Sequence, residues 1–169
     1  MNDRRDKHAS LPDQDATVPT PIILYTDGGC TGNEQLDASQ RVMSAAVSGA
    51  DGTILVHLTR SGGSNNIAEL WAVELALRWA KDNGHKAVEI RTDSTNTLAW
   101  VQGRIGRKMN DRNAVLKIWS RINVLRRDVK LTLAWIPREQ NLAGMILEEQ
   151  ELTAGWESAA RPRRRERTC

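Results

Sequence analysis

A chain of 169 residues, 40% of them hydrophobic, is long enough for one domain with a core of its own. No apolar run approaches the roughly 18 residues of a membrane helix, and the polar N-terminus lacks the apolar centre of a secretory signal, so we expect a cytoplasmic protein without a membrane partner. The 2 cysteines, Cys30 and Cys169, form no C-x-x-C pair and no spacing with histidine that would predict a zinc site.

The net charge of +3 is unevenly distributed. Residues 161–169 carry five arginines against one glutamate, and residues 104–130 carry nine basic side chains against two aspartates, a local +7. Such a segment is typical of a surface that binds polyanions, and it is equally typical of a solvated helix face followed by a charged tail. Charge alone leaves both interpretations open.

The predicted domain covers residues 22–155. Residues 1–21 are polar and contain prolines, and residues 156–169 are mostly charged, so both segments are predicted to be tails. Within the domain, "IILYTD" at 22–27 predicts a buried strand that ends at Asp27. Residues 43–49 and 53–60 predict a second and a third strand, which the turn "ADG" at 50–52 joins as a hairpin.

The apolar period then becomes helical. Ile67, Leu70, Trp71 and Leu75 follow the spacing of a helix that ends at "DNG", 82–84. The segments that follow predict a strand at 87–93, a short helix at 95–103, a basic helix at 112–127, a strand at 129–137 and a last helix near 141–152. The order βββαβααβα predicts an α/β domain with a mixed five-stranded sheet flanked by helices.

Three carboxylates lie at the ends of predicted elements, and each has a structural explanation of its own. Asp27 suits a turn at "DGG". Glu69 follows Asn66 by three residues, the spacing of a helix capping box. Asp93 precedes the short helix and could cap it.

Taken together, the three carboxylates favour a different interpretation. If the first and fourth strands are parallel neighbours, Asp27 and Asp93 lie at the same sheet edge, and the helix between them brings Glu69 over that edge. Crowded carboxylates repel one another unless a cation holds them, and oxygen ligands suit Mg²⁺ or Mn²⁺. The sequence therefore predicts a divalent metal site.

These motifs resemble those of a known family. "YTDGGCTGN", "SNNIAEL" and "TDS", in this order, resemble type 1 ribonuclease H over residues 22–155. The resemblance implies a ribonuclease H-like fold and a monomeric endonuclease that cuts the RNA strand of RNA–DNA hybrids. It further implies two Mg²⁺ or Mn²⁺ ions held by Asp27, Glu69 and Asp93, with 5′-phosphate and 3′-hydroxyl products.

The resemblance also implies where the hybrid binds. The family's contacts to the minor groove would fall on Cys30, Asn33, Asn65, Asn66 and Ser94, whose polar groups can reach bases and 2′-hydroxyls. The basic segment 104–130 would lie along the phosphates of the DNA strand.

One departure concerns the family's fourth carboxylate, which opens the last helix. Gly144 and Met145 stand where that aspartate is due. The site then has three members or is completed by another residue. Glu148 and Asn141 lie one turn to either side, and Glu148 is preferred over Asn141 because it keeps the charge, although it equally suits an ordinary solvent-facing helix position. The alternative is a catalytically weak hybrid-binding module that has kept the fold.

Two further departures concern loops. The family often places a histidine after the fifth strand, where this chain has Arg138 and Glu139. A glycine-rich hairpin that often follows the first motif is replaced by "EQLDASQRV", residues 34–42. Substrate contacts are expected to differ there.

Overall fold

The computed structural model describes residues 19–32 and 37–149. Its elements are β1 (Ile22–Thr31), η1 (Ala38–Gln40), β2 (Val42–Gly49), β3 (Ile54–Ser61), α1 (Asn65–Asp82), β4 (Ala87–Thr92), α2 (Thr95–Val101), α3 (Arg112–Leu125), β5 (Lys130–Trp135) and η2 (Arg138–Gln140). Residues 142–149 are also helical. The predicted element order is thus present, while the predicted end of the last helix at residue 152 and the substrate residue Asn33 lie outside the described residues.

The sheet is mixed, as predicted. Its strand order is β3-β2-β1-β4-β5. β1, β2 and β3 form an antiparallel meander, and β4 and β5 run parallel to β1. The parallel β1–β4 pair ends at Tyr25 and Arg91, so Asp27 and Asp93 each lie two residues beyond the last paired position. This register brings the first and fourth strand ends together.

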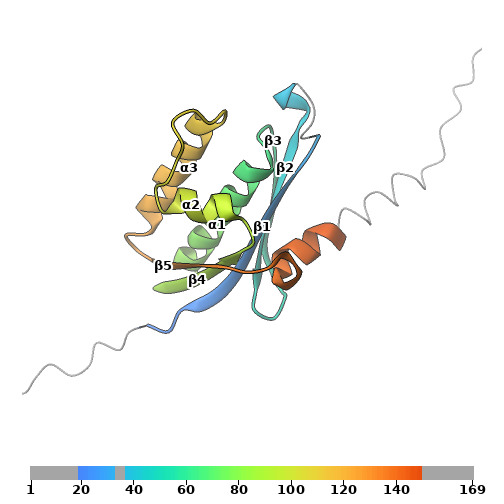
Figure 1. Cartoon of the computed structure of the whole chain (residues 1–169). Helices are drawn as coiled ribbons and strands as arrows, with labels where there is room; N and C mark the ends of the chain where they lie inside the picture. Colours follow the sequence, from blue (N-terminus) through green and yellow to red (C-terminus); the bar gives the residue numbers. More distant parts are fainter. Residues whose placement is uncertain (1–18, 33–36, 150–169) are drawn as a thin grey trace, which may run out of the picture.

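The helices cover both faces of the sheet. Helices α1, α2 and α3 lie on one face, and the helical segment 142–149 lies on the other (Figure 1). The main core lies under α1 and includes Leu24, Val47 and Ile90, whereas Ala46 packs with Ala143 on the opposite face. Among the described residues, no helix has the length and apolarity needed to span a membrane.

β1 differs from its prediction in length. It continues past Asp27 to Thr31 because β2 pairs with it along this whole stretch, with Asp27 opposite Ala46. Asp27 therefore lies inside a strand and is 8% exposed, which contradicts both the predicted strand end at Asp27 and the turn at "DGG".

Gly28 explains why glycine follows this aspartate. A Cβ atom at Gly28 would lie 2.2 Å from the carbonyl carbon of Ala68 and 2.3 Å from the backbone nitrogen of Glu69. The absence of a side chain therefore lets α1 approach β1 closely. This contact places Glu69 beside Asp27.

Both capping explanations for the carboxylates are wrong. Helix α1 begins at Asn65 with Ser64 at the N-cap, so Asn66 lies inside the helix and does not form a capping box with Glu69. Helix α2 is capped by Ser94, whose side chain accepts a hydrogen bond from the Thr97 backbone. Neither Glu69 nor Asp93 is needed as a cap.

Two tryptophans differ in burial. Trp100 is 8% exposed and packs in the main core. Trp135, at the end of β5, is 54% exposed. Its indole nitrogen donates a hydrogen bond to the Asp93 backbone carbonyl (3.1 Å), because β5 ends at this position and the side chain turns towards the neighbouring loop.

Candidate active site

The predicted carboxylates come from three elements that meet at one end of the sheet. Asp27 lies on β1, Glu69 near the start of α1, and Asp93 directly after β4. Asp27 and Glu69 line a hollow of about 270 Å³ together with Gly28, Gly29, Cys30, Asn65, Arg138, Leu147 and Glu148. The structure thus brings together Asp27 and Asp93, which are 66 residues apart in the sequence.

The electrostatics of the site show that these carboxylates interact. The pKa of Asp27 is raised to about 7, first by burial and then by the nearby Asp93 and Glu69 carboxylates, against a hydrogen bond from the Gly28 backbone that lowers it. Burial also raises the pKa of Glu69, partly offset by a hydrogen bond with the Ser94 side chain. The site therefore concentrates negative charge that the protein itself only partly compensates.

Arg138 supplies part of that compensation. Its guanidinium donates to Glu148 Oε1 at 2.6 Å and lies 3.9 Å from Asp93 Oδ2. The Arg138–Glu148 hydrogen bond, with the charges of Asp27 and Asp93, raises the pKa of Arg138. Arg138 thus stands as a positive group in front of the carboxylates, in the loop where the family often has a histidine.

Asn141 is buried beside Asp93. It is 0% exposed, and its amide nitrogen donates to Asp93 Oδ1 (2.8 Å) and to the Thr26 carbonyl (3.1 Å). These two bonds connect the residue before Asp27 with Asp93. Asn141 therefore fixes the position of Asp93, a role that differs from replacing a missing carboxylate.

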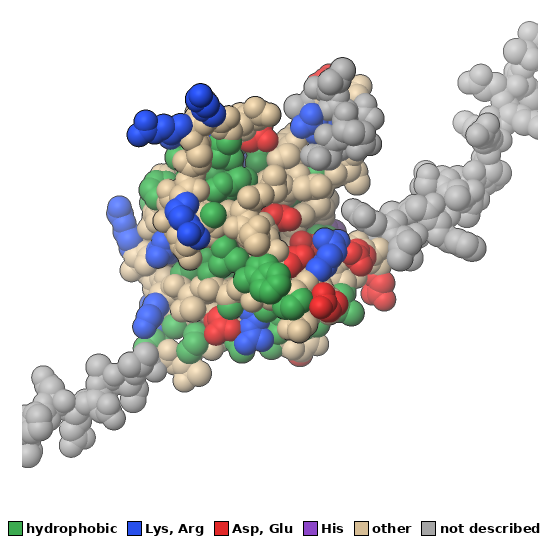
Figure 2. All heavy atoms as spheres, in the orientation of Figure 1, with side chains coloured by type: hydrophobic (Ala, Val, Ile, Leu, Met, Phe, Trp, Pro, Cys, Tyr) green, Lys and Arg blue, Asp and Glu red, His purple; other side chains and the backbone are tan. Residues whose placement is uncertain are grey.

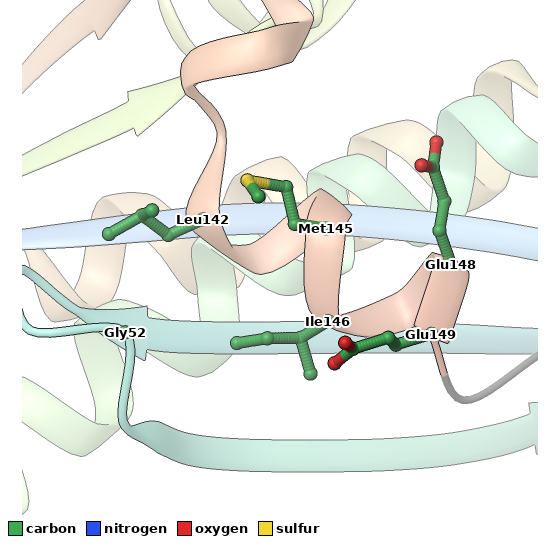
Figure 3. Close-up of a pocket in the computed structure, with 6 residues that line it drawn as sticks. All are labelled: Gly52, Leu142, Met145, Ile146, Glu148 and Glu149. Atoms are coloured by element: carbon green, nitrogen blue, oxygen red, sulfur yellow. The ribbon is translucent and has the colours of Figure 1, made fainter.

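Glu148 and Met145 share one side of the helical segment 142–149. Figure 3 shows both projecting from that side, with Ile146 and Glu149 on the other, beside a hollow of about 380 Å³ that Gly52 also lines. Glu148 also reaches the hollow of Asp27, but its side chain is 58% exposed and its carboxylate is paired with Arg138. As a fourth ligand, Glu148 would have to leave this ion pair.

The three carboxylates are the type of ligand that a hard divalent cation prefers. Asp27, Glu69 and Asp93 offer carboxylate oxygens, the ligands that Mg²⁺ and Mn²⁺ prefer. Burial and, to a lesser extent, the charges of Asp93 and Glu69 raise the pKa of Asp27, and a bound cation would oppose this shift. Within residues 19–32 and 37–149, however, no three His, Cys, Asp or Glu side chains form a preassembled metal cage. The carboxylates would have to close around an ion.

The predicted substrate residues lie around the same hollow. Cys30 and Asn65 line it, while Asn66 is exposed at the start of α1, where it accepts a hydrogen bond from Asn96. Ser94 is buried, and its hydroxyl is engaged within the protein, by capping α2 and by its bond with Glu69. A polar rim therefore borders the carboxylates.

The charge on this face of the molecule is divided. Figure 2 shows acidic side chains gathered near the C-terminal helical segment, and Lys and Arg side chains spread over the side that carries α3 and the loop before it. Among the residues of α3 and the loop before it, Arg107, Lys108 and Lys117 are exposed. A polyanion across this face would meet both regions.

Comparison with known proteins decides the family. A family model described as RNase H matches residues 19–144. The chain belongs to the RNase H family. No curated protein matches the chain. The family and the fold support an RNase H-type nuclease function.

Solved RNase H structures share the fold. The N-terminal RNase H domain of a Mycobacterium tuberculosis protein is 24% identical, with a TM-score of 0.60 over 83% of this chain and 99% of that one. RNase H1 from Halobacterium salinarum is 22% identical, with a TM-score of 0.60 over 80% and 99%. The compost-derived LC11-RNase H1 is 26% identical, with a TM-score of 0.58 over 79% and 97%, and it has also been solved with an RNA/DNA hybrid.

Sequence reasoning missed two site residues of this RNase H chain. Arg138 was noted only as the replacement for a histidine, although β5 pairs in parallel with β4, so the residues after Trp135 had to lie near Asp93. Asn96 was not singled out, although it lies three residues after Asp93. Strand register and helix position were the signals for these residues.

Proposed function

We propose that this chain is a metal-dependent endoribonuclease that hydrolyses the RNA strand of RNA–DNA hybrids, leaving 5′-phosphate and 3′-hydroxyl ends. The observation that carries the proposal is the meeting of Asp27, Glu69 and Asp93, with the pKa of Asp27 raised to about 7. Such convergence of repelling carboxylates costs stability and is typical of a functional site. Membership in the RNase H family supplies the reaction class.

The carboxylates would hold Mg²⁺ or Mn²⁺, with two ions expected once substrate is bound. When bound, such ions would supply activation of a water for attack on the phosphate and stabilisation of the charge on the leaving oxygen. Asn141 holds Asp93 in place through its 2.8 Å hydrogen bond, and Ser94 holds Glu69. Arg138 is positioned to receive a phosphate oxygen, because it is the cation nearest Asp93 in the described part of the chain.

A second candidate function is a hybrid-binding module with weak or no turnover. It is favoured by Gly144 and Met145, which stand where the family's fourth carboxylate is due, and by the Arg138–Glu148 ion pair, which engages the substitute carboxylate Glu148. In this alternative the carboxylates and Arg138 would serve recognition of the backbone alone.

Cleavage of an end-labelled RNA–DNA hybrid separates the two functions. With Mg²⁺ or Mn²⁺, the enzyme should cut only the RNA strand, and Glu148→Gln should slow cutting if Glu148 acts as a ligand. Glu149→Gln is the matched control, since Glu149 projects from the other side of the helix (Figure 3). Hybrid binding without cutting at either ion would favour the binding module.

A further inference from the structure

Asn66 and Asn96 form a contact between α1 and α2 just outside the carboxylates. The Asn96 amide nitrogen donates to Asn66 Oδ1 at 3.1 Å, and both side chains are exposed. Each is the second residue of its helix. Asn66 precedes Glu69 by three residues, so the two share a face of α1 about one turn apart. The amide pair therefore borders the candidate site on its solvent side.

The hydrogen bond determines which end of the Asn66 amide is available. Its oxygen accepts from Asn96, so its nitrogen, with two N–H donors, is left for an external partner. The minor groove presents acceptors at every base pair, purine N3 and pyrimidine O2, and 2′-hydroxyls can accept as well. Neutral amide donors match these groups, whereas phosphates are bound mainly by Lys and Arg.

We propose that Asn96 is a positioning residue that keeps the amide nitrogen of Asn66 directed at minor-groove acceptors of the bound hybrid. It acts through Asn66 and sets affinity for the hybrid without taking part in the hydrolysis. The inference rests on the proposed function, because it requires a hybrid lying across the first turn of α1. It extends the recognition surface to a residue of α2.

A double-mutant cycle on hybrid binding tests this role. All proteins carry Asp93→Asn so that the hybrid stays intact, and affinity is measured by fluorescence anisotropy. Asn96→Ala should weaken binding roughly three- to tenfold, as expected for the removal of one well-placed hydrogen bond. Adding it to Asn66→Ala should cause no further weakening, because Asn96 acts through Asn66. Gln102→Ala, at the opposite end of α2, is the control and should bind normally.

Two further readouts distinguish positioning from a general effect on the fold. The salt dependence of binding should stay the same in Asn96→Ala, because no phosphate contact is removed. Asn96→Asp should bind more weakly than Asn96→Ala, because a carboxylate would accept from the Asn66 nitrogen and turn its oxygen outward. With Asp93 intact, Asn96→Ala should raise KM for the hybrid and leave kcat unchanged.

The outcomes separate this inference from the proposed function. Unchanged affinity in Asn96→Ala, additive effects with Asn66→Ala, or a smaller salt slope would each overturn the positioning role. Absence of hybrid binding by the Asp93→Asn protein would overturn it as well. The expected coupling together with no cleavage by the wild type would support the positioning role and overturn the proposed hydrolysis.

Discussion

Asp27 links stability to pH and to metal. Its pKa is raised from 3.8 to about 7, first by burial and then by Asp93. The folded protein thus holds this proton more tightly than the unfolded chain does. The stabilisation from the proton is complete below about pH 4 and is lost as the pH rises through about 7.

Replacing Asp27 by Asn should therefore stabilise the metal-free protein at pH 8 but not at pH 4. Since one pKa unit corresponds to about 1.4 kcal/mol, we expect a gain on the order of 2 kcal/mol in unfolding free energy at pH 8. Urea unfolding in EDTA, for both proteins at both pH values, measures it. If the unfolding free energies of the wild type and Asp27→Asn differed by the same amount at pH 4 and at pH 8, the raised pKa of the buried Asp27 carboxylate would be contradicted. Added Mg²⁺ should stabilise only the wild type.

Met145 is one of two residues, with Gly144, that stand where the family's fourth carboxylate is expected. Its side chain is 55% exposed in a hollow next to the carboxylates that Arg138 and Glu148 also line, so Met145→Asp should cost little stability and add a carboxylate beside the site. We expect Mn²⁺ to bind roughly tenfold more tightly, which corresponds to about 1.4 kcal/mol. Titration calorimetry of Met145→Asp, with Met145→Asn as the uncharged control, measures the change. Equal Mn²⁺ affinities of the two variants would show that position 145 does not face the ion.

At the scale of elements, the packing of β1 against α1 positions two of the three carboxylates. Gly28→Ala would place a Cβ atom 2.2 Å from the Ala68 backbone, which cannot yield without moving the helix. We expect a decrease of about 2–4 kcal/mol in stability and weaker metal binding, because Glu69 moves with α1. Gly106→Ala is the control, since nothing lies within 4 Å of the added atom. If thermal unfolding showed the same small loss of stability in Gly28→Ala and Gly106→Ala, the close packing of β1 against α1 would be contradicted.

Most of the strands and helices, but few of the contacts between them, could be predicted from the sequence. Apolar periodicity predicted the strands and helices, and their order predicted the parallel β1–β4 pair that joins Asp27 to Asp93. It could not predict that β1 continues through "DGGCT", because that pairing depends on β2, nor that Trp135 turns outward to bond the Asp93 carbonyl. The roles of Asn141 and Arg138 depend likewise on tertiary contacts across the sheet end.

At the scale of the whole molecule, the starts of α1 and α3 lie nearer the candidate site than their ends do. Ser64 donates to Asp111 at the starts of α1 and α3, and Lys81 pairs with Asp128 near their ends, so the two helices run parallel. The 18 residues of α1 span about 27 Å. Only the first part of the basic segment 104–130 therefore lies at the end of the molecule that carries the carboxylates.

This arrangement predicts which basic residues bind the hybrid. Arg107→Gln combined with Lys108→Gln, both exposed before α3, should weaken hybrid binding and reduce its salt slope by about 1.8, or about 0.9 for each phosphate that is no longer neutralised. Lys86→Gln combined with Arg127→Gln, at the far end of the helices, is the charge-matched control and should leave the slope unchanged. A larger effect of the control pair would place the hybrid elsewhere on the molecule.

The most direct test of the central claim compares the wild type with Asp93→Asn on an end-labelled RNA–DNA hybrid, with Mg²⁺ and with Mn²⁺. The carboxylate site predicts that the wild type cuts the RNA strand and leaves the DNA strand intact. It predicts that Asp93→Asn folds and binds the hybrid but does not cut. Cutting retained in Asp93→Asn would contradict the assignment of the metal site, and binding without cutting by the wild type would contradict the proposed enzyme.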